Sequence, residues 1–134
     1  MLLLYTDGGS RGNPGPAAIG AVLYSETQQL LDFTAEYKGV LTNNQAEYLG
    51  LLAGLGLANK HANESLTVYM DSELVVKQMK GEYKVKHPDI IPLKAKVDSL
   101  LVNFSQVNFV HIERAKNKFA DKLVNIALDS AANA

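Results

Sequence analysis

The sequence predicts an α/β fold in which helices flank one mixed β-sheet, built as a single domain over residues 1–134. Two observations lead to this prediction. Three strand-like segments follow one another with only turns between them, which indicates an antiparallel meander. Strands and amphipathic helices then alternate through the rest of the chain, which is typical of a layered α/β domain.

The predicted meander consists of three apolar segments at residues 2–5, 17–23 and 30–37. Glycine and proline are frequent in residues 8–16, which predicts a turn directly after Asp7. A short polar segment joins the second and third strands as a hairpin connection. The first three strands are therefore expected to pair antiparallel in chain order.

The first predicted helix begins at Thr42 or Asn43, either of which is a natural N-cap, and ends near Lys60. Its apolar residues recur every three or four positions, so we expect them to face the sheet. Glycine is unfavourable inside a helix by about 1 kcal/mol, so three helical glycines predict close approach to the strands. The expected sheet-facing residues are Leu49, Leu52, Ala53 and Gly56, and the glycines are Gly50, Gly54 and Gly56.

Helices and strands alternate in the remaining sequence. Pro92 falls in the first turn of a predicted helix, where proline is tolerated. The last helix has an Ala-rich end that we expect to fray, and an apolar side formed by Phe119, Leu123, Ile126 and Ala127. The predicted elements are a strand at 66–70, helices at 72–81 and 88–101, a strand at 106–112 and a helix at 118–131.

Composition places the chain among ordinary globular domains, with 47% hydrophobic and 20% charged residues. It has no cysteine, which suits a reducing compartment, and no apolar stretch near the ~20 residues of a membrane span. We therefore expect a cytoplasmic protein with no membrane partner. Its net charge is −1, so any nucleic-acid-binding surface has to be a local basic patch.

Four acids occupy related places in the predicted fold. Asp7 and Asp71 each follow a strand, whereas Glu47 and Asp121 lie in the first turns of helices. Adjacent parallel strands would bring the two aspartates together at the carboxyl edge of the sheet, where open α/β sheets bind ligands. Clustered carboxylates repel one another, and a pair of Mg²⁺ or Mn²⁺ ions would relieve that repulsion. Taken alone, Asp7-Gly8 is equally typical of an ordinary turn.

Four segments in this order resemble the signature motifs of type 1 ribonuclease H, and the resemblance extends from about Leu2 to Ala127. One such segment would be weak evidence, whereas four in the same order, each with an acid in matching context, are specific. The segments are Tyr5-Thr-Asp7-Gly-Gly-Ser-Arg-Gly-Asn-Pro-Gly15, Thr42-Asn-Asn-Gln-Ala-Glu47-Tyr, Tyr69-Met-Asp71-Ser and Asn117-Lys-Phe-Ala-Asp121-Lys-Leu.

The resemblance implies a ribonuclease H-like fold with a five-stranded mixed sheet in the order 3-2-1-4-5. It implies hydrolysis of the RNA strand of RNA–DNA hybrids by two-metal-ion catalysis, leaving 5′-phosphate and 3′-hydroxyl ends. It assigns Asp7, Glu47, Asp71 and Asp121 as the catalytic and metal-binding acids, with two Mg²⁺ ions or Mn²⁺ as a substitute. A monomer without an organic cofactor is expected.

The resemblance also implies a binding surface for the hybrid. Short amides and backbone groups suit the minor groove, and Thr42 resembles part of a pocket for a DNA phosphate. Asn43 and Asn44 would also cap a helix, and Arg11 would contact either a phosphate or only water. The implied nucleic-acid-binding residues are Gly9, Ser10, Arg11, Gly12, Asn13, Thr42, Asn43, Asn44 and Gln45.

Two departures from the family pattern point to its short archaeal and bacterial branch. The basic protrusion of other members is reduced to residues 81–88, and the chain has no tryptophan. The catalytic histidine loop also looks shortened, because His111 falls in a predicted strand. Arg114, Lys116 and Asn117 would then form a loop for phosphate contact or product release, or else a plain surface loop.

Two alternative functions remain open at the level of sequence. A reduced basic region would be compatible with cleavage of double-stranded RNA as well as hybrid. A non-catalytic module that binds hybrid or RNA on the same fold is the other alternative. Retention of all four acids favours catalysis over binding alone.

Overall fold

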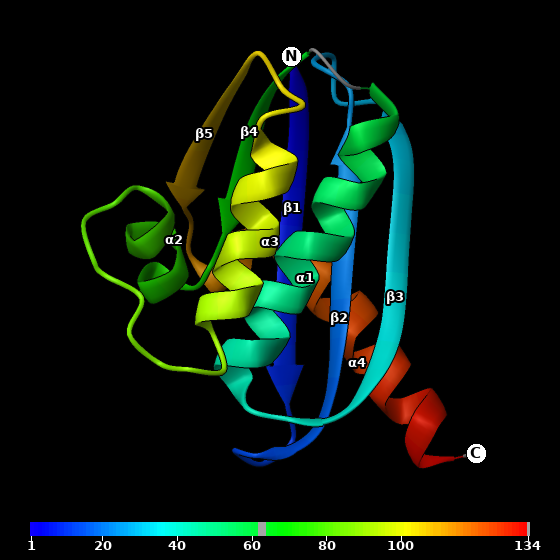
Figure 1. The fold of residues 1–134 in the computed structure, drawn as a ribbon. Helices are drawn as coiled ribbons and strands as arrows, with labels where there is room; N and C mark the ends of the chain where they lie inside the picture. The colour runs from blue at the N-terminus through cyan, green and yellow to red at the C-terminus, as the bar shows by residue number, and fades with distance from the viewer. Residues whose placement is uncertain (62–63, 134) are drawn as a thin grey trace.

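The computed structural model describes residues 1–61 and 64–133 and shows a five-stranded sheet in the order β3-β2-β1-β4-β5. The first three strands pair antiparallel, and β4 and β5 run parallel to β1 (Figure 1). This confirms the predicted order of strands. The strands are β1 (Leu2–Ser10), β2 (Gly15–Tyr24), β3 (Leu30–Leu41), β4 (Ser65–Met70) and β5 (Gln106–His111).

Helices cover the two faces of the sheet unequally. α1 and α3 lie side by side on one face. α4 lies on the other face, behind the lower parts of β2 and β3 (Figure 1). None of the helices in the described residues is long and apolar enough to cross a membrane. The helices are α1 (Asn43–Ala58), α2 (Glu73–Met79), α3 (Ile91–Leu101) and α4 (Lys118–Ala132), with 3₁₀ turns at Asn59–His61 and Arg114–Lys116.

Side-chain caps mark the starts of two helices, and the cap of α1 is one of the two residues predicted for it. Thr42 is the N-cap of α1, where its hydroxyl accepts a hydrogen bond from the Gln45 amide and the Gln45 side chain returns one to the Thr42 backbone. Ser72 caps α2, and Gly81 follows that helix with a positive φ of 79°. Local sequence therefore determines where these helices begin and end.

The predicted end of β1 is wrong. The strand continues past Asp7 to Ser10, with Gly8 paired to Ile19, so Asp7 lies inside the strand instead of starting a turn. Gly8 is part of the ladder because α1 crosses it closely: a β-carbon at Gly8 would meet the Ala46 carbonyl group. Here glycine allows helix–strand contact instead of providing a turn.

The predicted sheet-facing side of α1 is also wrong. Leu49, Leu52 and Ala53 are only half-buried and Gly56 is exposed. The helix lies so close to β1 that glycines occupy the contact, with Gly50 against the Asp7 carbonyl and Gly54 against Thr6 and Leu4. The close approach predicted for the helical glycines is confirmed at Gly50 and Gly54 but not at Gly56, where a β-carbon would meet nothing. The buried residues of α1 are Ala46, Tyr48, Gly50, Leu51, Gly54, Leu55 and Ala58.

The apolar side of α4 was predicted correctly only in part. Leu123 and Ala127 are buried, but Phe119 is 40% exposed and Ile126 is 48% exposed. α4 packs over Gly20 of β2, where a β-carbon would meet the Ala120 carbonyl oxygen. With this contact, α4 buries Ala120, Val124 and Leu128 together with Leu123 and Ala127.

Two glycine substitutions in α1 are expected to have opposite effects on stability. Gly50→Ala would push a β-carbon against the Asp7 backbone, so we expect a loss of about 1–3 kcal/mol in the free energy of unfolding. Gly56→Ala would enter open space on an exposed helical surface and stabilise by about 0.5–1 kcal/mol. Urea denaturation of both variants checks this, and equal effects would contradict the close approach of α1 to β1.

Candidate active site

Three of the four predicted acids meet at the edge of β1. Asp7, Glu47 and Asp71 each offer a carboxylate oxygen, and these oxygens lie within 4.8 Å of one another. Asp7 comes from β1, Glu47 from α1, and Asp71 directly follows β4. Segments far apart in the sequence thus converge on one small volume.

The register of the parallel strands explains this convergence. Tyr5 pairs with Tyr69, and Asp7 and Asp71 each lie two residues further along the chain. They therefore stand level with each other on the sheet face that α4 partly covers. β4 ends at Met70, so the edge of β1 beside Asp7 is open and Glu47 reaches it from the α1 side.

The acids line a groove of about 600 Å³ that includes the fourth acid, Asp121. Asp121 is not part of the tight three-residue group; it lies in the first turn of α4 and forms an ion pair with Arg114, Nη2 to Oδ1, at 3.2 Å. The predicted binding residues that line the groove are Gly9, Ser10, Arg11, Asn43, Asn44 and Arg114. The four acids thus share one surface with part of the predicted binding set.

Burial gives these carboxyl groups unusual proton affinities. Burial first, and then the charge of Asp71, raises the pKa of Asp7 to about 7. Burial and the charges of Asp7 and Asp71 raise the pKa of Glu47 well above its usual range. Burial likewise raises the pKa of Asp71, although the charge of Arg114 opposes it. Without a cation, the folded site therefore favours protonated acids.

The arrangement fits a hard divalent cation. Glu47 Oε2 is buried and has no hydrogen-bond partner among residues 1–61 and 64–133, which leaves a lone pair available in the cluster. Carboxylate oxygens are the ligands that such ions prefer, and a cation would offset the mutual repulsion of the acids. Asp7, Glu47 and Asp71 would hold the ion, with Asp121 on the wall of the same groove.

Hydrogen bonds join the glycine-rich segment to the start of α1. The Asn43 side-chain oxygen accepts from the Ser10 amide at 2.9 Å, and the Asn13 side-chain oxygen accepts from the Asn43 amide at 3.1 Å. Ser10 also donates from its hydroxyl to the Gly12 carbonyl. These bonds hold two of the predicted binding segments in one surface, while Gly12, Asn13, Thr42 and Gln45 lie outside the groove lining.

Arg11 has two partners within the protein. Its guanidinium forms an ion pair with Asp129 at 2.7 Å and lies 3.4 Å from the Asn125 side-chain oxygen. Both partners are on α4. Arg11 therefore ties the glycine-rich segment to α4 while it lines the groove.

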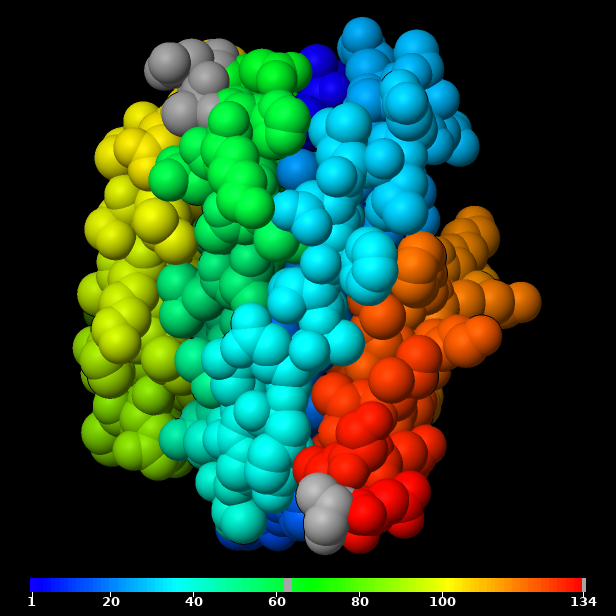
Figure 2. Space-filling model, turned by 90° about the vertical axis from the view of Figure 1, so that its right-hand side faces the viewer, coloured from blue at the N-terminus to red at the C-terminus, as the bar shows by residue number. Residues whose placement is uncertain are grey.

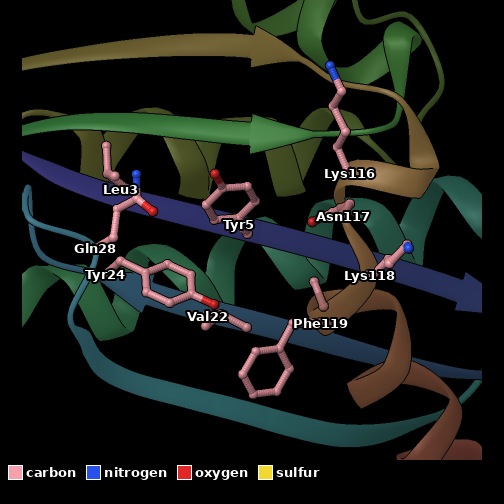
Figure 3. Close-up of a pocket in the computed structure, with 10 residues that line it drawn as sticks. Leu3, Tyr5, Val22, Tyr24, Gln28, Lys116, Asn117, Lys118 and Phe119 are labelled. Carbon is pink, nitrogen blue, oxygen red and sulfur yellow. The ribbon is translucent and has the colours of Figure 1, made fainter.

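The loop before α4 has two different surfaces. Arg114 faces the acids, whereas Asn117 is 1% exposed and donates from its side chain to the Thr6 carbonyl at 2.9 Å. Lys116 and Asn117 line a separate pocket on the sheet face (Figure 3). Asn117 thus fastens the loop to β1. His111 is the last residue of β5, so it lies in a strand as predicted, and its side chain is exposed.

Sequence reasoning missed two polar residues in the groove, Ser72 and Asn125. Ser72 follows Asp71 and caps α2. Asn125 stands one helical turn after Asp121 and donates to its backbone carbonyl at 3.1 Å. The helical spacing from Asp121 was a usable signal for Asn125, because residues four apart share a helix face.

A family profile and several relatives match this chain. The profile, described as reverse transcriptase-like, covers residues 5–127, and the chain belongs to this ribonuclease H-like family. The chain is 46% identical over 132 residues to the bifunctional protein Rv2228c of Mycobacterium tuberculosis, matching 98% of this chain but 36% of that protein. It is 41% identical over 127 residues to ribonuclease HI of Halobacterium salinarum, matching 95% of this chain and 64% of that protein.

A solved structure extends this similarity to the whole domain. LC11-RNase H1, crystallised in complex with an RNA/DNA hybrid, superposes with a TM-score of 0.93 at 43% identity. The match covers 98% of this chain and 99% of that one. The fold predicted from the sequence is therefore the fold of a ribonuclease H1 domain.

The metal-free protein is expected to lose stability as pH rises. The folded-state pKa of Asp7, about 7, lies above the ordinary value of 3.8, so its contribution is fully present below about pH 4 and is lost as pH rises through 7. In EDTA, the free energy of unfolding should fall by on the order of 2 kcal/mol between pH 5 and 8. Denaturant titrations check this.

Asp7→Asn provides the matched comparison, because an amide has no charge to desolvate. Its unfolding free energy in EDTA should depend much less on pH over the same interval. Addition of Mg²⁺ at pH 8 should restore stability to the unsubstituted protein. Stability that rises from pH 5 to 8 in EDTA would contradict the raised pKa of the acids.

Proposed function

We propose that this domain is a ribonuclease H that hydrolyses the RNA strand of RNA–DNA hybrids. The observation that carries the proposal is the meeting of Asp7, Glu47 and Asp71 within 4.8 Å, in a groove also lined by Asn43 and Asn44. Relatives over the full domain are named ribonuclease H, and one is described with bound hybrid. Asp121 completes the proposed set of catalytic acids.

The reaction is a phosphodiester hydrolysis. A water oxygen forms a bond to phosphorus, and the bond from phosphorus to the 3′-oxygen breaks, leaving a 5′-phosphate and a 3′-hydroxyl. When bound, two Mg²⁺ ions, or Mn²⁺ in their place, would activate the water and stabilise the leaving oxygen. Asp7, Glu47, Asp71 and Asp121 would hold these ions, and Arg114 offers positive charge beside Asp121 for a phosphate oxygen.

Recognition of the hybrid would use uncharged groups beside the acids. The amides of Asn43 and Asn44 and the backbone of Gly9 and Ser10 line the groove, and such groups suit 2′-hydroxyls and base edges in a minor groove. Thr42 and Gln45 would act mainly through the cap that fixes Asn43 in place. We propose a monomer in the cytoplasm, consistent with a chain that has no cysteine.

Activity should require a divalent cation and Asp7. Purified protein is expected to cleave the RNA strand of a blunt hybrid in Mg²⁺ or Mn²⁺ but not in EDTA. Asp7→Asn should lower the rate by at least about a hundredfold, because it removes a buried ligand from the cluster. Gel analysis of an end-labelled RNA strand, with each metal titrated separately, provides the measurement.

Asp98→Asn is the matched control, since it neutralises an aspartate on α3 that pairs only with Lys94 among the described residues. It should cleave at the rate of the unsubstituted protein. Circular dichroism verifies that both variants are folded. Metal-independent cleavage, or full activity of folded Asp7→Asn, would disprove the proposed mechanism.

A further inference from the structure

A part of the sheet face opposite α1 and α3 forms an open aromatic surface beside the groove. Tyr5 stacks on Tyr69 with ring centroids 4.7 Å apart, and Tyr24 meets Tyr5 edge to face at 5.7 Å. We call these three residues the tyrosine face. α4 begins only beyond it, and in the space-filling view α4 (orange to red) flanks only the lower part of β3 (Figure 2).

The tyrosine face borders a pocket of about 270 Å³ that contains groups of several kinds (Figure 3). Tyr5 and Tyr24 form its floor, Phe119 closes one side, and Lys116 and Lys118 stand at the end nearer the acids. Neither lysine forms an ion pair with any of the described residues. Proteins that bind single-stranded nucleic acids combine aromatic rings, on which the bases stack, with positively charged side chains, which contact the phosphates.

Gln28 at the rim has a backbone conformation that local sequence disfavours. Its φ is +66°, and it is the one non-glycine residue with positive φ among residues 1–61 and 64–133. Glycine or asparagine normally occupies such a place in a hairpin. The side-chain amide of Gln28 lines the same pocket, and strained residues of this kind are concentrated at binding sites. An amide there can both donate to and accept from the edge of a base.

The tyrosine face adjoins the proposed active site along β1 and β4, with the loop that Asn117 fastens to Thr6 between the two surfaces. Tyr5 and Tyr69 are a cross-strand pair, and each lies two residues before an acid on the same sheet face. Two residues of a strand span about 7 Å, so the rings and the acids are near neighbours on the sheet. A nucleic-acid strand held at Asp7 and Asp71 that passed over this loop would bring its following bases to these rings.

We propose that the tyrosine face binds unpaired bases of a single-stranded nucleic-acid segment adjoining the hybrid. The tyrosine rings stack the bases, Gln28 contacts a base edge, and Lys118 contacts the backbone phosphates. This inference rests on the proposed function, because it extends the substrate strand out of the groove. It predicts a preference for hybrids with a single-stranded junction over blunt duplexes.

The test is binding of a single-stranded twelve-nucleotide oligothymidine in EDTA at low salt, followed by fluorescence anisotropy of a label on the oligonucleotide. We expect Tyr24→Leu and Lys118→Ala each to weaken binding about five- to tenfold. Lys96→Ala, which removes the same charge from the exposed surface of α3, should bind as the unsubstituted protein does. The chain has six tyrosines and no tryptophan, so quenching of tyrosine fluorescence that is reduced in Tyr24→Leu is a second readout of stacking.

The same variants separate this inference from the proposed function. Both should cleave a blunt hybrid at the unsubstituted rate in Mg²⁺, since neither substitution touches the acids. Absence of oligonucleotide binding, or binding unchanged in both variants, would overturn the inference even if the blunt hybrid is cleaved. Self-association that Tyr24→Leu abolishes, without an effect on oligonucleotide affinity, would also overturn it and identify the face as a protein interface.

Discussion

The close contact between α1 and β1 is the constraint on which the rest of the site depends. Gly50 lies against the Asp7 carbonyl and Gly8 lies against the Ala46 carbonyl, so the helix rests directly on the strand backbone. This contact brings Glu47 to the open edge of β1. A larger residue at either glycine would lift the helix and move Glu47 away from Asp7. Backbone packing thus sets the spacing of the acids.

That spacing brings with it electrostatic repulsion between the carboxylates, which a bound cation would offset. Partly buried carboxylates raise one another's pKa, and an isolated domain would be more stable with neutral residues there. The surrounding structure has to hold them in place: Arg114 pairs with Asp121, and Asn117 anchors the adjacent loop to β1. Carboxyl groups with raised pKa values lower the stability of the folded protein, and such groups are typical of functional sites.

Much of the fold and the acid cluster was predictable because local signals specify it. The Thr42 cap marked the start of α1, and the acids Asp7 and Asp71 near the ends of two predicted strands indicated one shared edge. The helical glycines correctly predicted the close approach of α1 at Gly50 and Gly54, but the apolar residues assigned to its buried face were wrong. The Arg11–Asp129 pair and the conformation of Gln28 depend on segments brought together by the tertiary fold, so no local pattern reveals them.

Anomalous diffraction from crystals of this domain soaked with Mn²⁺ tests the central claim most directly. The account predicts a strong peak among the carboxylates of Asp7, Glu47 and Asp71, and its loss in Asp7→Asn crystals. A second peak on the side of Asp121 is expected for a two-ion site. Density that shows no metal among these acids at saturating Mn²⁺, in crystals with the groove open to solvent, would contradict it.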